Sequence, residues 1–280
     1  NILLNPIFIF GFLFIPAFGV KGIGIATIIS QFVSFIIILL KVLKNPRVLK
    51  ITNEFLAPKF LYFKNIFFQS MPITISICGY ALAAAIIFTY VGQSGENAVA
   101  GYGVGTRIEQ VVLLPILGIN TAIISIIAQN YGAKNFDRIK KTYFTAIKYA
   151  FIIMITSGII VFISAGIITS IFSSDPEVIE YGKRYLKISA FVLPAYPVFF
   201  LSNGFFMALK KSENAMISNF FRNVLNPIVV FYIAKYINAS FETFFWLWVG
   251  INWFFSITYF FIIIYYFKIK LNKSSTVVHP

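Results

Sequence analysis

The sequence predicts an all-α, polytopic membrane protein with about eight transmembrane helices. Three observations support this fold class. Hydrophobic residues make up 59% of the 280 residues and charged residues only 11%, whereas a soluble domain is nearer half apolar and a quarter charged. Apolar runs of about 20 residues, the length that spans a bilayer, follow one another along the chain. Basic residues gather in the connections between these runs, as they do beside membranes.

The sequence predicts eight spans. They are residues 1–17, 22–43, 66–92, 99–128, 144–172, 185–209, 216–237 and 243–267. The run 99–128 is the least lipid-like because it contains Arg107 and Glu109. Pro194 and Pro197 fall inside the run 185–209 and are candidate hinge residues, with a static bend as the alternative.

The basic content of the connections alternates, which predicts the orientation of the chain. One set of connections contains Lys41, Lys44, Arg47, Lys50, Lys59, Lys64, Lys134, Arg138, Lys140, Lys141, Lys148, Lys210, Lys211, Lys268, Lys270 and Lys273. The other set contains Lys21, Lys183, Arg184, Lys187 and Lys235. Cytoplasmic loops carry the excess of Lys and Arg, so we expect a multi-pass protein of the plasma (inner) membrane with both chain ends cytoplasmic.

The longest polar connection divides the chain into two parts. Residues 44–64 contain two prolines and several basic residues, which is typical of a linker at the cytoplasmic surface. The motif Leu4-Asn5-Pro6-Ile7 recurs after this linker as Leu225-Asn226-Pro227-Ile228, which indicates an internal repeat of about six helices. We therefore expect residues 1–43 to be the last two helices of an N-terminal lobe. We expect residues 65–268 to be a six-helix C-terminal lobe and residues 269–280 a cytoplasmic tail.

Composition excludes several classes of function. The single Cys78 and the single His279 exclude an internal disulfide and a metal site built from clustered His and Cys. The net charge of +14 does not indicate a nucleic-acid partner, because the basic residues lie beside membrane runs. Glycines at 101–105 follow no strand and precede no Lys-Ser/Thr pair, so they favour helix packing over nucleotide binding. The chain begins at Asn1 within an apolar run, which predicts that part of a longer protein precedes it.

Four motifs resemble the multidrug and toxic compound extrusion (MATE) family. They are NPIFIF at 5–10 with GVKGIGIATIIS at 19–30, GYGVGTRIE at 101–109, AQNYGAKN at 128–135 followed by Arg138, and FSSDPEV at 172–178 leading to Tyr185 and Leu186. Their order and spacing extend over nearly the whole chain. Two positions depart from the family pattern: Asn5 stands where an Asp commonly precedes the proline, and Ala128 stands where Gly is frequent.

The resemblance implies secondary active efflux of organic, often cationic, compounds by antiport with Na⁺ or H⁺ through alternating access. It also implies two six-helix lobes, of which this chain would hold the last two helices of the first and all of the second. The implied partners are a small-molecule substrate and the lipid bilayer, the expected state is a monomer, and no cofactor other than the coupling ion is implied. Some branches of the family place coupling carboxylates in the helices that correspond to 66–92 and 185–209. Neither run contains an acid here, so coupling through the other lobe is favoured, as in the damage-inducible-F-type branch.

Other functions remain as alternatives. A lipid-linked oligosaccharide flippase of the same superfamily needs a lumen rich in Arg and Lys, and only Arg107 and Arg222 qualify for such a lumen here. A membrane-embedded transferase enzyme needs clustered His or an Asp-rich motif, and the sequence contains neither. We therefore expect a transporter and not an enzyme.

Glu109 is the main candidate site residue, because a carboxylate within a membrane span normally faces a cavity or a partner. It is able to bind a cation, accept a proton or hold a basic substrate. Arg107 points to another side of the same helix. The alternative for both residues is anchoring near the outer end of the helix, and for Arg222 anchoring at the cytoplasmic end. Candidate cavity-lining residues, which could instead form interhelical hydrogen bonds, are Gln69, Tyr80, Gln110, Asn120, Tyr196 and Asn203.

Overall fold

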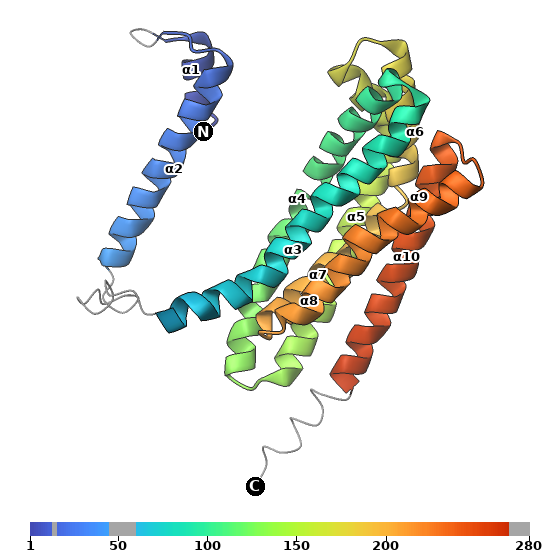
Figure 1. The fold of residues 1–280 in the computed structure, drawn as a ribbon. Helices are drawn as coiled ribbons and strands as arrows, with labels where there is room; N and C mark the ends of the chain where they lie inside the picture. The colour runs from blue at the N-terminus through green and yellow to red at the C-terminus, as the bar shows by residue number, and fades with distance from the viewer. Residues whose placement is uncertain (13–15, 45–59, 269–280) are drawn as a thin grey trace. The chain divides into compact units, whose positions relative to one another are not determined.

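The computed structural model describes residues 1–12, 16–44 and 60–268 (Figure 1). The chain divides into two compact units, Asn1–Lys64 and Asn65–Pro280. The described residues form helices and no strand, which confirms the all-α class. The side chains of Gln69 and several neighbours in its helix are outside the described part.

The first unit contains a short helix and a long one. The helices are α1 (Leu4–Phe10) and α2 (Val20–Leu43). The expectation of one helix over residues 1–17 is wrong, because α1 ends before Gly11, whose φ of 81° lies in the left-handed region. The chain then turns back, and the amide of Phe18 donates to the carbonyl of Phe8 over 3.0 Å. Residues 13–15 lie outside the described part.

The second unit is a bundle of helices. In chain order they are α3 (Phe60–Val91), η2 (Gly92–Ser94), α4 (Glu96–Gly132), α5 (Phe136–Phe172), α6 (Pro176–Ser189), η3 (Leu193–Ala195), α7 (Tyr196–Ala208), α8 (Ser212–Phe220), the π-helix η4 (Phe221–Leu225), α9 (Asn226–Tyr236) and α10 (Phe241–Tyr266). α3 begins at Phe60, within the first unit and earlier than the expected span 66–92. The remaining linker residues 45–59 and the expected tail 269–280 lie outside the described residues.

The helices begin where the sequence supplies capping side chains. The side chain of Asn135 accepts from the amide of Arg138 at the start of α5, over 3.2 Å. Asp175 accepts from the amide of Glu177 over 2.8 Å, and Pro176 occupies the first position of α6. Such caps satisfy amides that the first turn of a helix leaves free.

Five helical segments of the described part are long and apolar enough to cross a membrane. They are Val20–Leu43, Glu96–Gly132, Phe136–Phe172, Pro176–Ala208 and Phe241–Tyr266. Large apolar side chains face outward along them. On α5, Ile159, Ile163, Ile167 and Ile171 form one stripe at four-residue spacing and are 56–77% exposed. Water would oppose this exposure whereas lipid does not, so the fold is that of a polytopic membrane protein.

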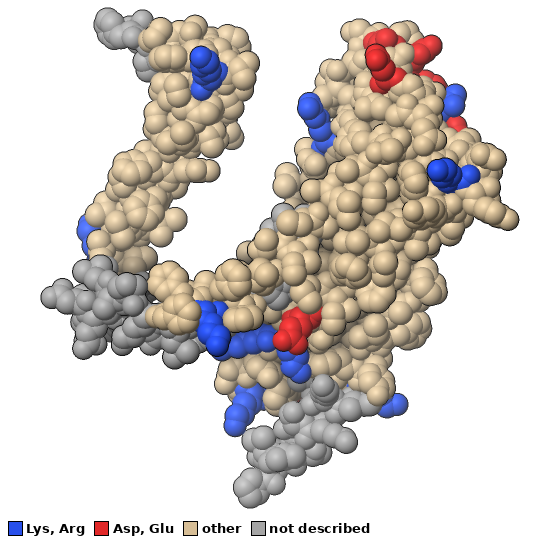
Figure 2. Space-filling view, in the orientation of Figure 1, with Lys and Arg blue, Asp and Glu red and all other residues tan. Residues whose placement is uncertain are grey.

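Charged side chains lie toward the ends of the second unit, and a broad belt between them is uncharged on the face shown in Figure 2. The core beneath this surface is built from large side chains that are less than 2% exposed, among them Tyr143, Phe205, Phe206 and Phe244. Tyr143 also shares a hydrogen bond of 2.7 Å with Ser202, which joins α5 to α7. This bond ties the two helices together within the core.

Candidate functional site

The carboxylate of Glu109 is held by two tyrosine hydroxyls from other helices. Glu109 lies in α4 and is partly buried. Tyr185 of α6 donates to one carboxylate oxygen, and Tyr196 of α7 donates to the other over 2.5 Å. Hydrogen bonds to an ionised carboxylate are stronger than neutral ones, so the carboxylate has a fixed orientation.

The break between α6 and α7 positions these two tyrosines. On one continuous helix their Cα atoms would be separated by about 16 Å along the axis. The prolines interrupt that helix, since Pro194 lies in η3 and Pro197 lies in the first turn of α7. The candidate hinge residues thus lie directly beside the tyrosine that contacts Glu109, although a static bend would place them there equally well.

A pocket of about 180 Å³ surrounds the Glu109 carboxylate. Its lining residues are Ile87, Tyr102, Thr106, Glu109, Gln110, Leu113, Tyr185, Tyr196, Phe245 and Trp248. The ring of Tyr102 packs edge-on against Tyr185 with centroids 4.9 Å apart and stacks on Phe245 at 5.4 Å. We call this the Glu109 pocket. It combines one carboxylate with a wall of packed aromatic rings.

Gly105 makes room for this arrangement. A Cβ atom at Gly105 would overlap the ring of Tyr185. At Gly103, by contrast, a Cβ atom would meet nothing within 4 Å. The glycine-rich segment therefore serves helix packing at Gly105, and this packing sets the position of a tyrosine that holds Glu109.

The other predicted residues fall into three groups. Gln110 and Tyr196 line the Glu109 pocket. Asn203 instead joins three helices, because it donates to Asn219 of α8 and accepts from Tyr259 of α10, each over 3.1 Å. Arg107 and Tyr80 are exposed on the surface of the unit.

The two remaining predicted residues are Gln69 and Asn120. Gln69 lies in α3, but its side chain is outside the described part. The side-chain oxygen of Asn120 is buried without a hydrogen-bond partner, and it lies directly against Gly204. Asn120 is therefore at a helix–helix contact between α4 and α7 and does not line the Glu109 pocket.

Arg222 does not anchor the chain at a membrane surface as expected, because it is only 9% exposed. Its guanidinium lies over the rings of Phe199 and Tyr196, with its central carbon 4.2 and 4.7 Å from their centroids. Its Nε donates to Asn252 of α10 over 3.3 Å. The residue belongs to η4, where the amide of Asn226 bonds to the carbonyl of Phe221 in a widened turn just before Pro227.

Sequence reasoning named Tyr196 as a cavity residue but missed the other aromatic neighbours of Glu109. Tyr102 and Tyr185 lie within or beside the family-like motifs, but only the fold shows that they surround the carboxylate. Among the described residues there is no group of three or more His, Cys, Asp or Glu side chains that could hold a metal ion. A single carboxylate with hydroxyl donors is thus the chemical feature of the site.

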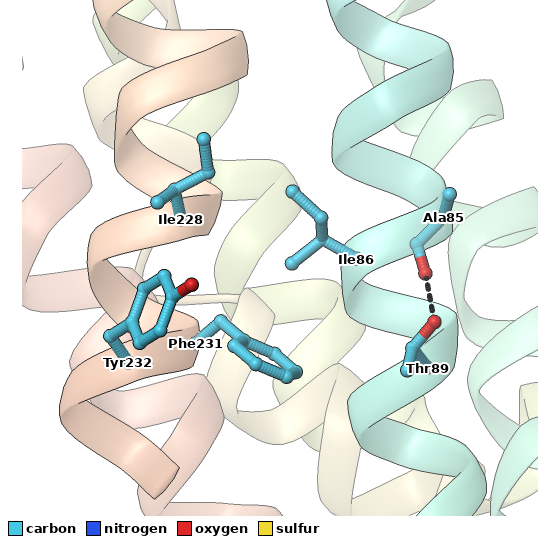
Figure 3. Close-up of a pocket in the computed structure, with 6 residues that line it drawn as sticks. All are labelled: Ala85, Ile86, Thr89, Ile228, Phe231 and Tyr232. Carbon is cyan, nitrogen blue, oxygen red and sulfur yellow. Dashed lines mark hydrogen bonds between the residues drawn. The ribbon is translucent and has the colours of Figure 1, made fainter. Parts of the chain in front are cut away.

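A larger pocket between α3 and α9 has a different character (Figure 3). Its volume is about 320 Å³, and Ala85, Ile86, Ile228, Phe231 and Tyr232 line it together with Thr89. The hydroxyl of Thr89 donates to the carbonyl of Ala85 within α3, over 2.8 Å. The Thr89 hydroxyl is therefore already bonded within its own helix, and the described lining of this pocket lacks the charge of the Glu109 pocket.

Comparison with known proteins places these features in a family. The family model described as MatE matches residues 72–232. This chain belongs to the MATE family. Members of the family are transporters and not enzymes, so the expected class of protein is confirmed.

Curated relatives match most of this chain. A probable multidrug resistance protein of Bacillus subtilis, YpnP, is 28% identical over 257 residues, which are 89% of this chain and 52% of that protein. A FAD transporter of Shewanella oneidensis is 24% identical over 239 residues, which are 85% of this chain and 53% of that protein. The chain thus spans about half the length of the curated relatives it matches.

Solved transporter structures share the fold. A crystal structure of MATE in complex with MaL6 has a TM-score of 0.85 at 22% identity and covers 99% of this chain and 61% of that chain. A MOP superfamily transporter from Pyrococcus furiosus has a TM-score of 0.83 at 24% identity, over 98% of this chain and 60% of that chain. At this level of identity the likeness shows the fold alone.

Proposed function

We propose that the protein exports organic compounds across the plasma membrane by alternating access, in antiport with Na⁺ or H⁺. Membership of the MATE family supports this function, as do relatives described as probable multidrug resistance proteins. We further propose that it acts as a monomer with both ends of this chain in the cytoplasm. The basic connections favour that orientation.

The observation that carries the proposal is the Glu109 carboxylate in its aromatic pocket. A carboxylate attracts a cation, and the faces of aromatic rings attract an organic ammonium in the same place. Both kinds of group line the Glu109 pocket. The geometry therefore favours the positively charged head group of an organic substrate.

The size of the pocket limits what it holds. Sites that enclose a whole drug-sized ligand have volumes of about 300–1,000 Å³, and the Glu109 pocket has about 180 Å³. We infer that it takes a head group while the rest of the substrate lies outside it. A proton or Na⁺ that neutralises Glu109 would remove the attraction for that head group, and this gives the coupling ion a means of releasing the substrate.

The flippase alternative receives less support. Recognition of a pyrophosphate calls for several Arg and Lys side chains around one cavity. Among the described residues, Arg222 is the charged side chain that is buried, and the Glu109 pocket contains a negative charge instead.

Efflux from cells that produce the full-length protein tests the proposal. Cells are loaded with ethidium, a fluorescent organic cation, and its loss is followed with and without a protonophore and a sodium ionophore. We expect efflux to stop when the coupling gradient collapses. Efflux that continues unchanged after both gradients are removed would show that antiport is wrong.

A further inference from the structure

The buried guanidinium of Arg222 lacks a counter-charge in the described part of the chain. Its Nε donates to Asn252 over 3.3 Å, but its Nη1 is buried with no hydrogen-bond partner. The ion pairs among the described residues join Glu180 to Lys183 and Arg184, and Arg184 to Glu242. None of them includes Arg222.

Such a group is costly to maintain. A charge inside a membrane bundle is normally paired or lines a functional cavity, and one that is buried without a partner destabilises the fold. Stacking on Phe199 and Tyr196 offsets part of the lost hydration. It leaves the positive charge without an anion and leaves Nη1 without an acceptor.

Arg222 lines a pocket of about 460 Å³ between α7, α8 and α10. The wall is mostly aromatic and includes Phe199, Phe255 and Tyr259, while Ser218 and Asn214 add neutral polar groups. None of the described residues that line it is acidic. We call this the Arg222 pocket, and its described lining shares no residue with that of the Glu109 pocket.

A second positive charge lies beside the same pocket. Lys211 donates its ammonium hydrogen to the hydroxyl of Tyr266 over 2.6 Å, and Tyr266 lines the Arg222 pocket. The nitrogen of Lys211 is also 4.9 Å from the centroid of that ring. The local charge is therefore positive at two points and favours an anion.

We propose that the Arg222 pocket binds an organic anion, in which one carboxylate or phosphate group contacts Arg222 and an apolar body packs on the aromatic wall. A planar guanidinium matches the geometry of carboxylate and phosphate oxygens. The volume is sufficient for a bicyclic aromatic body. Two sources share this chemistry: a soluble aromatic acid and an anionic lipid of the bilayer.

Binding to the full-length protein in nanodiscs tests this site. The probe is radiolabelled naphthalene-2-carboxylate in equilibrium dialysis, and naphthalene-2-carboxamide is its uncharged counterpart. Arg222→Gln is expected to weaken carboxylate binding by about tenfold to a hundredfold, the effect of losing a hydrogen bond between charged groups. Binding of the carboxamide should change little. Arg138→Gln, at an exposed arginine, is the matched control and should leave both affinities unchanged.

The bilayer composition separates the two sources. In nanodiscs of phosphatidylcholine, the carboxylate should bind more tightly to the wild type than to Arg222→Gln. If adding phosphatidylglycerol removes that difference by competition, the occupant is lipid; if the difference persists, the occupant is a soluble acid. Equal affinity for the carboxylate and the carboxamide in both membranes would overturn the proposal.

A second variant keeps the test valid if Arg222→Gln does not fold. Thr258 lines the Arg222 pocket from α10, and its hydroxyl bonds within its own helix to the carbonyl of Phe254. Thr258→Phe fills the pocket and leaves Arg222 in place, so it should reduce carboxylate binding at least tenfold. Unchanged binding in this variant would place the anion elsewhere and contradict the proposal.

Discussion

The hydroxyl of Tyr196 lies 2.5 Å from a carboxylate oxygen of Glu109 and donates a hydrogen bond to it. The ring of the same tyrosine lies against the guanidinium of Arg222, at 4.7 Å from its central carbon. One side chain at the start of α7 thus contacts both a negative and a positive group of the bundle. Pro197 follows Tyr196 directly. A change in the backbone at the α6–α7 break would therefore alter the contacts of Tyr196 with both Glu109 and Arg222.

Replacing Glu109 by Gln should weaken the binding of an organic cation. The change removes the charge and keeps the size of the side chain. We expect the affinity for ethidium to fall about tenfold or more, since a charge-assisted contact contributes about 1.5–3 kcal/mol. Binding to the purified full-length protein, followed by fluorescence, measures this. Glu96→Gln, at an exposed acid on the same helix, is the control. Equal affinities in the two variants would exclude Glu109 from the substrate site.

The hydroxyls of Tyr185 and Tyr196 should support ethidium binding by orienting Glu109, and not by a separate contact with the substrate. Tyr196→Phe removes the donor and keeps the ring on Arg222. With Glu109 present, we expect Tyr196→Phe to weaken ethidium binding by about 1 kcal/mol, because the carboxylate loses its fixed orientation. In the Glu109→Gln background the same change should cost much less, so a double-mutant cycle should give a coupling energy of about 0.5–1 kcal/mol. Tyr185→Phe serves as the parallel case, and strictly additive effects would contradict this model.

Gly105 and Gly103 should differ sharply when each is replaced by Ala. A methyl group at Gly105 would overlap the ring of Tyr185, whereas at Gly103 it would meet nothing within 4 Å. We expect Gly105→Ala to destabilise the protein by about 1–3 kcal/mol through overpacking. Gly103→Ala should be neutral or stabilising by up to about 1 kcal/mol, from its better helix propensity. Thermal unfolding in detergent measures the difference, and ethidium binding should fall only in Gly105→Ala. Equal stabilities would show that Tyr185 is not packed as described.

The orientation of the chain can be tested by labelling single cysteines. Ala133 lies between α4 and α5, Ser174 lies between α5 and α6, and both are exposed. In a background in which Cys78 is replaced by Ser, Ala133→Cys should be protected from a membrane-impermeant maleimide added to intact cells. Ser174→Cys should react. This follows from the excess of basic residues near the first connection, and the opposite pattern would reverse the proposed topology.

The sequence alone was sufficient for the class and the family. Length and apolarity of the runs led to a polytopic helical bundle, and the motifs led to the MATE family, which the match over residues 72–232 confirms. It also singled out Glu109, because a carboxylate in an apolar run stands out from its neighbours. The orientation, the domain boundaries and the roles of the predicted site residues remain predictions.

Other features depended on the tertiary structure. The short α1 and the start of α3 at Phe60 differ from the expected boundaries, because helix ends depend on local turns that hydropathy does not report. Arg222 was expected at a membrane surface and is buried against aromatic rings. Only the packing of η4 on α7 decides that.

The reason for this division is physical. In a soluble protein, apolar residues mark the buried face of a helix, but lipid and protein interior are both apolar. The sequence therefore determined which segments are helical and apolar, and which of their residues are charged. It did not determine which faces meet, so Tyr185 and Tyr196 could not be recognised as partners of Glu109. Only the tertiary structure, which brings α4, α6 and α7 together, decided that one carboxylate has two tyrosine donors and an aromatic wall.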